Sequence, residues 1–166
     1  MNDVKAAIAK EARRLEEDCE HSAQQHFEKS VSSLKLHYWL GVPATLSAAI
    51  SGISAVTLPP LVTFTASVSA TILAALVTWL NPREDHEMHH EKGAEYDALK
   101  RAARMFAEID ILAVADINVL RSQLDGLLER KHTIDRKRPA TPSGKFYKLA
   151  KRNIAEGRTT NRVDSN

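Results

Sequence analysis

The sequence predicts an all-α protein: a two-helix transmembrane hairpin with long cytoplasmic helices before and after it, which form a bundle. Three observations lead to this prediction. No glycine or proline interrupts residues 1–40, which favours one long helix. No Asp, Glu, Lys or Arg occurs from Leu36 to Pro82, and the pair Pro59-Pro60 divides this uncharged run. Helical spacing of apolar residues resumes after Pro82.

The length and composition are those of a single domain, expected at residues 1–157, with a disordered tail at 158–166. The chain has 166 residues and a formal net charge of +2, which indicates no particular partner. Cys19 is the only cysteine, so no intramolecular disulfide can form. The charged N-terminus lacks an apolar core and is therefore not a signal peptide.

The first element expected is a cytoplasmic helix over residues 1–37 that continues into the uncharged run. Asn2 and Asp3 are residue types that cap helix N-termini. Apolar or small residues then recur mostly every four positions, which indicates one stripe of a helix. The stripe consists of Val4, Ile8, Leu15, Cys19, Ala23, Phe27, Val31 and Leu34.

Two uncharged arms follow, at residues 38–57 and 61–80, with a turn at 58–60 that contains Pro59 and Pro60. A helix of about 20 mainly apolar residues crosses the hydrocarbon core of a bilayer, so both arms have the required length. In a hairpin, Tyr38 and Trp39 would lie on the same side as Trp79 and anchor the hairpin at the membrane interface.

The charges next to the arms predict the orientation. Lys29, Lys35 and Arg83 flank the side that carries the two tryptophans, whereas the proline turn carries no charge. Because positive residues are retained inside, both termini of this multi-pass membrane protein are expected in the cytoplasm.

Hydroxyl residues form a face on each arm, opposite a bulky apolar face. Such a face either packs the arms together or lines a pore within a homo-oligomer. The arms contain no ionisable residue, which argues against a proton relay or tight ion selectivity. The residues expected in one of these two roles are Ser47, Ser51, Ser54, Ser67, Thr71 and Thr78.

Cytoplasmic helices are expected over residues 81–135, with a seam at Leu120, Leu124 and Leu127 that packs within the bundle or between subunits. Pro139 and Pro142 end this region, and residues 139–157 form a basic amphipathic segment. Residues 130–166 hold eleven Lys and Arg but only three acids. This segment is either a solvated tail or a surface for anionic lipid headgroups, with no specific nucleic acid expected. The residues expected at the lipid are Arg136, Lys137, Arg138, Lys145 and Lys148.

A five-residue stretch, His86-Glu-Met-His-His90, matches the zinc-protease pattern H-E-x-x-H. A zinc hydrolase using His86, Glu87 and His90 is a remote alternative, because no third ligand is identified by its spacing. A solvated helix face is the favoured interpretation. We therefore expect no enzyme activity, no catalytic or metal-ligating residue and no cofactor.

The segments LEEDCEHSAQQHFEKS, HYWLGVPATLSAAISGISA, LVTWLNP and HEKGAEYDALKRAARMFAEIDI, followed by a basic C-terminal segment, resemble the SLATT-domain proteins. These are two-transmembrane effectors of bacterial conflict systems, and the resemblance spans residues 11–157. Its sharpest parts are the W-L-G-x-P motif, the W-L-N-P motif, and G-x-x-Y-x-x-L followed by F-x-x-I-D. None of these is catalytic.

The resemblance implies an effector that perforates the inner membrane of an infected cell. Members of that family are associated with nucleotide-signal synthases and sensor domains, and we expect no room in this chain for a fused sensor or nucleotide-binding domain. Its trigger is therefore expected to be a partner protein or a nucleotide signal. Two other interpretations remain: a non-enzymatic membrane scaffold that recruits a partner through its cytoplasmic helices, and a soluble bundle with the uncharged run as its core.

Overall fold

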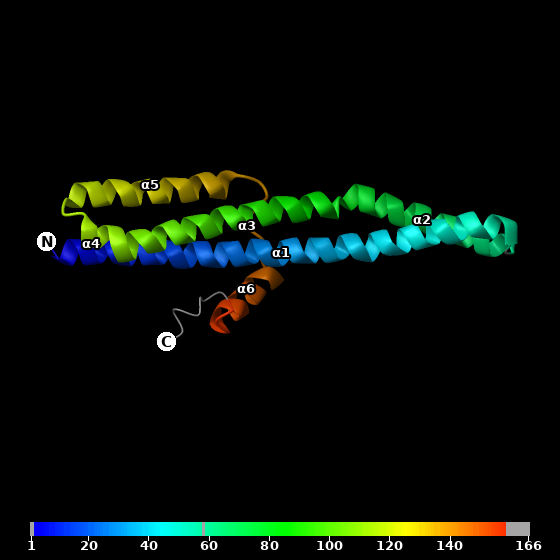
Figure 1. Ribbon diagram of the computed structural model, residues 1–166, viewed down its shortest axis with the longest axis horizontal. Coiled ribbons are helices and arrows are strands. Elements are labelled where there is room, and N and C mark those ends of the chain that lie inside the picture. Colours follow the sequence, from blue (N-terminus) through cyan, green and yellow to red (C-terminus); the bar gives the residue numbers. More distant parts are fainter. Residues whose placement is uncertain (1, 58, 159–166) are drawn as a thin grey trace. The chain divides into compact units, whose positions relative to one another are not determined.

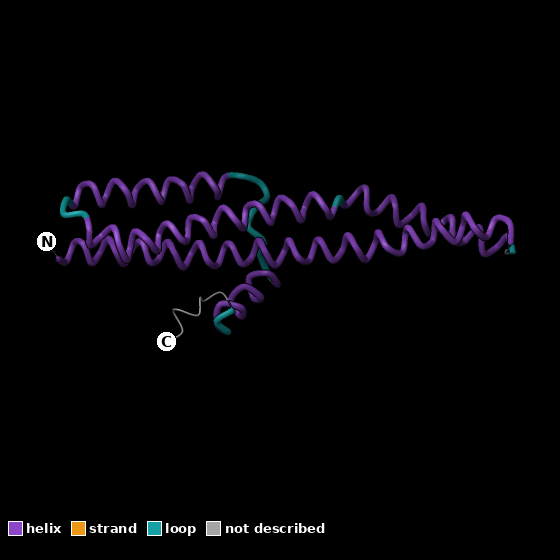
Figure 2. Tube along the Cα trace, viewed as in Figure 1, coloured by secondary structure: helices purple, strands orange, loops and turns teal. Residues whose placement is uncertain are grey.

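The structure, a computed structural model, describes the backbone of residues 2–57 and 59–158 and the side chains of residues 3–52 and 59–158. The described chain is all-helical, which confirms the predicted fold class at this level (Figures 1 and 2). Its long helices are α1 (Asn2–Thr57), α2 (Pro60–Leu80), α3 (Pro82–Met105) and α5 (Ile117–Arg136). Shorter ones are the π-helix η1 (Phe106–Asp110), α4 (Ile111–Ala113) and α6 (Lys145–Ala155).

The helices begin and end close to the positions that the sequence predicts. The first arm is the C-terminal part of α1, which continues through Pro43. Pro60 occupies the first turn of α2, where its missing N–H costs no hydrogen bond. Asn81 separates α2 from α3 in the left-handed conformation, with φ of 40°, which asparagine tolerates better than most residues.

The chain divides into two compact units. We call residues 2–29 with 88–158 the bundle unit, and residues 30–87 the apolar unit. The helices α1 and α3 contribute residues to both. The predicted tail beyond Arg158 lies outside the described residues.

Three helices form the core of the bundle unit: the N-terminal part of α1, the α3–η1 segment, and α5. Figure 1 shows α5 running beside α3. One buried cluster joins Leu15 and Cys19 of α1 to Tyr96 and Leu99 of α3 and Ile134 of α5. A second cluster contains Ala12, Phe106, Ala107, Ile111, Leu120 and Leu124. Leu127 and Leu128 pack against both clusters, so the core is continuous along the bundle.

Helix α6 packs on α1 within the bundle unit. The side-chain amide of Asn153 donates a hydrogen bond of 2.6 Å to the Glu28 carboxylate. The ring of Tyr147 stacks on His21, with centroids 6.4 Å apart. Ala150 is fully buried and Asn153 nearly so, whereas the lysines of α6 are exposed. The apolar side of the predicted amphipathic helix is therefore covered by the chain itself.

A close approach between α1 and α3 depends on Gly93. A Cβ atom at this position would lie 2.9 Å from two carbons of the Phe27 ring. We expect Gly93→Leu to lower the free energy of unfolding by about 2 kcal/mol, because the added side chain must displace a ring that packs against the core. Chemical unfolding followed by circular dichroism measures this change.

Gly126 of α5 provides the matched control. It is exposed, and apart from its two chain neighbours and the nearby backbone of its own helix no atom lies within 4 Å of the position of a Cβ there. Gly126→Leu is expected to leave stability unchanged or to raise it by up to about 1 kcal/mol, through helix propensity. Equal effects of the two substitutions would contradict the packing assigned to Gly93.

Candidate functional site

The first candidate site is the surface of α2 in the apolar unit. This 21-residue helix has no charged residue, and none of its residues is buried. Within the described residues, one helical stretch passes the length and hydropathy test for a membrane span, with a mean hydropathy of 1.9 over its best window, none of it buried. The core helix of a soluble protein would be mostly buried, so α2 does not serve as a core helix within this chain.

The same unit exposes further large apolar side chains on α1. Burying such a surface is strongly favourable, and contiguous apolar patches of this kind mark membrane or protein contacts. On α1 the exposed residues include Leu36, Val42, Leu46 and Ile50, and on α2 they include Leu61, Val62, Phe64, Val68, Ile72 and Leu80. The side chains of residues 53–57, at the end of the first arm, lie outside the described residues.

The predicted interface anchors are among the most exposed aromatic side chains that the structure describes. Tyr38 is 60% exposed, Trp39 77% and Trp79 83%. A tryptophan normally contributes large buried area in a soluble core, so exposure of both indoles requires a different environment. Indole rings have that environment at the headgroup level of a bilayer.

The hydroxyl residues of the two arms are engaged within the apolar unit. Ser51 and Ser67 form a hydrogen bond between α1 and α2, with their Oγ atoms 2.5 Å apart. Thr71 and Thr78 donate to carbonyl oxygens of their own helix, those of Ser67 and Ala74. Ser47 is half-buried, and the side chain of Ser54 lies outside the described residues. Of these bonds, the one between Ser51 and Ser67 joins the two arms, as a contact between packed helices does.

Polar pairs lie at the end of the apolar unit opposite the prolines. Ser30 Oγ is 2.7 Å from His86 Nδ1, and the Ser33 hydroxyl donates a 2.5 Å hydrogen bond to the Asp85 carboxylate. Both serines are buried. Buried polar groups of this kind are stable only when paired, so the pairs fix the register of α1 against the start of α3.

The residues of the H-E-x-x-H stretch make hydrogen bonds and packing contacts with neighbouring side chains. His86 contacts Ser30, and the exposed Glu87 carboxylate accepts a 3.0 Å hydrogen bond from Arg83 Nε. His90 packs against the Phe27 ring, with centroids 5.6 Å apart. Among the described residues no group of three His, Cys, Asp or Glu has metal-binding geometry. The arrangement gives no support to a zinc hydrolase.

The second candidate site is a buried polar cluster in the bundle unit, centred on His26 and His89. His26 is 0% exposed, and its Nδ1 lies 2.8 Å from Nδ1 of His89, so one ring donates a hydrogen and the other accepts it. The Nε2 atom of His26 is buried and makes no hydrogen bond with the described residues. Burial, with His89 and Lys92 nearby, lowers the pKa of His26 to about 4.

Lys92 and Tyr96 extend this cluster towards α5. The buried Lys92 ammonium donates to the carbonyl oxygens of Lys137 and Pro139, both at 2.7 Å, just beyond the C-terminus of α5. The Tyr96 hydroxyl donates a 2.5 Å hydrogen bond to the Asp135 carboxylate. Burial lowers the pKa of Lys92 and raises that of Tyr96. These bonds fasten the end of α5 to α3.

The His26 environment predicts a loss of stability at mildly acidic pH. In the folded chain the pKa of His26 is about 4, below its ordinary value of 6.5, so the unfolded chain binds a proton that the folded chain excludes. The neutral His26 therefore contributes to the free energy of unfolding above pH 6.5, and this contribution is lost as the pH falls towards 4. Between pH 7 and pH 5 we expect it to amount to about 2 kcal/mol.

Chemical unfolding of the purified chain at both pH values measures this loss. The His26→Gln variant is expected to lose about 2 kcal/mol less than the parent over the same interval. His132 is exposed on α5, and His132→Gln should keep the parental pH dependence. A parental pH dependence in His26→Gln would refute the assignment.

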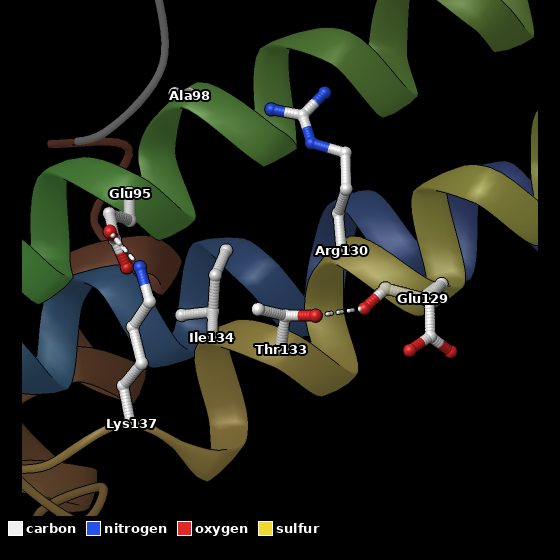
Figure 3. A pocket seen from close by; sticks show the side chains of 7 residues that line it. All are labelled: Glu95, Ala98, Glu129, Arg130, Thr133, Ile134 and Lys137. Carbon is white, nitrogen blue, oxygen red and sulfur yellow. Dashed lines mark hydrogen bonds and ion pairs between the residues drawn. The ribbon is translucent and has the colours of Figure 1, made fainter.

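A shallow hollow of about 350 Å³ lies between α3 and α5 (Figure 3). An ion pair of 2.5 Å between Lys137 Nζ and Glu95 stands at one end, and Figure 3 shows Arg130 extending towards α3. The Thr133 hydroxyl donates to the carbonyl oxygen of Glu129 in its own helix. The charges of both signs in this hollow favour no particular ligand.

The predicted seam and basic segment have different environments. Leu120 and Leu124 are buried in the bundle core, and Leu127 is half-buried against it. Of the predicted lipid contacts, Lys137 is paired with Glu95, whereas Arg136, Arg138, Lys145 and Lys148 are exposed. The seam therefore has a packing role within the chain.

His26, His89, Lys92 and Tyr96 are the candidate residues that were not predicted as a polar cluster. A signal was present in the sequence. Ala12, Leu15, Cys19, Ala23, His26, Ser30 and Ser33 follow one another at spacings of three and four, and all are buried. The buried face of α1 thus extends from apolar residues to the polar residues His26, Ser30 and Ser33. A search for apolar residues alone does not detect these polar positions.

Comparison of the chain with models of protein families, with curated proteins and with solved structures gives no match.

Proposed function

We propose that the protein is a membrane-inserted, oligomeric effector that forms pores in, or disrupts, the bacterial inner membrane in antiviral defence. In this proposal the apolar unit crosses the bilayer as a hairpin, and both termini are cytoplasmic. The activating signal comes from a partner protein or a nucleotide. The observation that carries the proposal is α2, an uncharged 21-residue helix with no buried residue. The resemblance to SLATT-domain proteins supports the effector role.

The bilayer accounts for the exposed surface better than water does. Exposed aliphatic and aromatic side chains cover both described arms, and Tyr38, Trp39 and Trp79 lie near their ends. In hydrocarbon the backbone polar groups of a continuous helix are satisfied internally, and the hydroxyls of Ser51, Ser67, Thr71 and Thr78 have partners within the unit. The unit thus has the chemistry of a membrane segment.

Two measurements test the proposal in sequence. Membranes from cells that express the chain are first washed with alkaline carbonate, and the protein should remain in the pellet. Induced expression, with any cognate partner, should then collapse the membrane potential and admit a small impermeant dye. Recovery of the chain in the supernatant would refute membrane insertion. Retention of the chain in the pellet together with an intact membrane potential would refute pore formation but not membrane insertion.

A membrane scaffold that recruits a partner is the second candidate. The Ser51–Ser67 hydrogen bond favours it, because this contact uses two of the predicted pore-lining hydroxyls for packing between the arms. Replacing Ser51 by leucine separates the two functions. If Ser51 lines water, dye influx should fall while carbonate resistance is kept, whereas an unchanged influx assigns the residue to packing.

A further inference from the structure

The exposed side of α6 carries a cluster of positive charge. The helix contains four basic residues and no acid between Lys145 and Ala155. Lys145, Lys148 and Lys151 recur every three positions, so they share one side of the helix, and all three are exposed. The opposite side is occupied by α1, through the buried Ala150 and the Asn153–Glu28 hydrogen bond.

The acids near this cluster already have partners. Glu28 accepts from Asn153, and Glu156 pairs with Arg152 at 3.8 Å and with Arg158 at 2.9 Å. Lys148 and Lys151 have no ion pair among the described residues. The Lys145 ammonium lies 4.9 Å from the centroid of the Phe146 ring, which does not neutralise its charge. The side of α6 formed by Lys145, Lys148 and Lys151 therefore keeps its positive charge.

We propose that the Lys145–Lys148–Lys151 side of α6 binds the phosphate groups of anionic phospholipids on the cytoplasmic face of the membrane. This rests on the membrane insertion proposed above. Two features of the chain favour lipid over nucleic acid: the apolar unit brings the chain to a bilayer, and the Phe146 ring is half-buried and so offers little of its face to a base. Basic residues close to an anionic leaflet bind it electrostatically and lose this binding in high salt.

The structure also separates this surface from the neighbouring basic residues. Lys137 is paired with Glu95, and its carbonyl oxygen accepts from Lys92. Its charge is thus partly balanced by an acid of α3, although the side chain is 51% exposed. The three lysines of α6 have no such ion pair among the described residues, so we centre the proposed lipid contact on α6.

The test uses the full chain in nanodiscs of phosphatidylcholine alone and of phosphatidylcholine mixed with phosphatidylglycerol. Lysine acylation, quantified by mass spectrometry, reports the accessibility of each amine. We expect acylation of Lys148 and Lys151 to slow about fivefold in the anionic discs and to recover in high salt. Lys10, exposed on α1, is the internal reference and should react equally in both.

A variant provides the second arm. In Lys148→Gln/Lys151→Gln, acylation of Lys145 in anionic discs should rise to the rate seen in phosphatidylcholine discs. Equal acylation in both disc types would overturn the lipid assignment. So would protection of these lysines by an RNA oligonucleotide or by inorganic phosphate in phosphatidylcholine discs. Failure of membrane insertion itself would be recognised separately, because the chain would not co-elute with either disc.

Discussion

A chain in which Val68 and Ile72 are both replaced by aspartate should no longer resist carbonate extraction. The two residues lie one turn apart on α2 and are 41% and 55% exposed. An aspartate at the centre of a membrane-spanning helix costs about 3 kcal/mol, so the pair costs roughly 6 kcal/mol, before the loss of the apolar side chains is counted. Immunoblots of carbonate-washed membranes measure the result.

The chain offers a closely matched control. Ile109 and Leu112 lie in η1 and α4 of the bundle unit and are 58% and 81% exposed. Ile109→Asp/Leu112→Asp introduces the same charges at exposed aliphatic positions outside the apolar unit, and this variant should stay in the pellet. If the α2 variant is retained as well as the control, the proposal that α2 crosses the bilayer fails.

Truncation of Leu99 to alanine should produce the largest loss of stability in the bundle unit. Leu99 is 0% exposed and packs in the cluster that joins α1, α3 and α5. Leu→Ala at a buried site costs between about 2 and 5 kcal/mol through lost transfer free energy and the cavity left behind, and we expect about 3. Denaturant unfolding in detergent, followed by circular dichroism, gives the change.

Leu112→Ala is the corresponding control, since it makes the same substitution at a leucine that is 81% exposed. It should change the free energy of unfolding by less than about 0.5 kcal/mol. A small effect at Leu99 would mean that the bundle unit does not form the core described here. A large effect at both positions would point to a partner that covers Leu112.

Helix positions were largely predictable because the sequence marks them strongly. Pro59 and Pro60 divide the uncharged run and Pro82 ends it, and the second arm begins within one residue of its predicted start. The apolar period of α5 is regular, so Leu120 and Leu124 were correctly expected to pack. Membrane crossing by both arms stays a prediction. It depends on the surrounding bilayer and on the pairing of the two arms, and a local sequence pattern determines neither.

The buried faces were less predictable, for two physical reasons. On α1 the stripe of four-residue spacings drifts off the core, so Val31 is 47% exposed while Ser30 and Ser33 are buried. A strict period of four rotates slowly around a helix of 3.6 residues per turn. The spacing places His26 and Ser30 on the buried face, but their partners could not be found from the sequence, because each lies more than 50 residues away on α3.

The π-helical turn explains a second difference. An α-helical spacing of three from Phe106 would continue the buried face at Ile109, but Ile109 is 58% exposed and Ile111 only 7%. Residues Phe106–Asp110 wind as a π-helix, which takes more residues per turn than an α-helix. The face that continues from Leu99 and Phe106 is therefore displaced, and Ile111 enters the core instead of Ile109.

The same turn has an evolutionary consequence. A π-helical turn is what an α-helix becomes when it accommodates one additional residue without breaking, and such turns occur frequently at functional sites. A homologue that lacks this residue would align with a single-residue gap between positions 106 and 110, inside a helix, where gaps are normally penalised. Searches for distant homologues should therefore allow a deletion there, since an ungapped alignment would place the segment before or after it out of register.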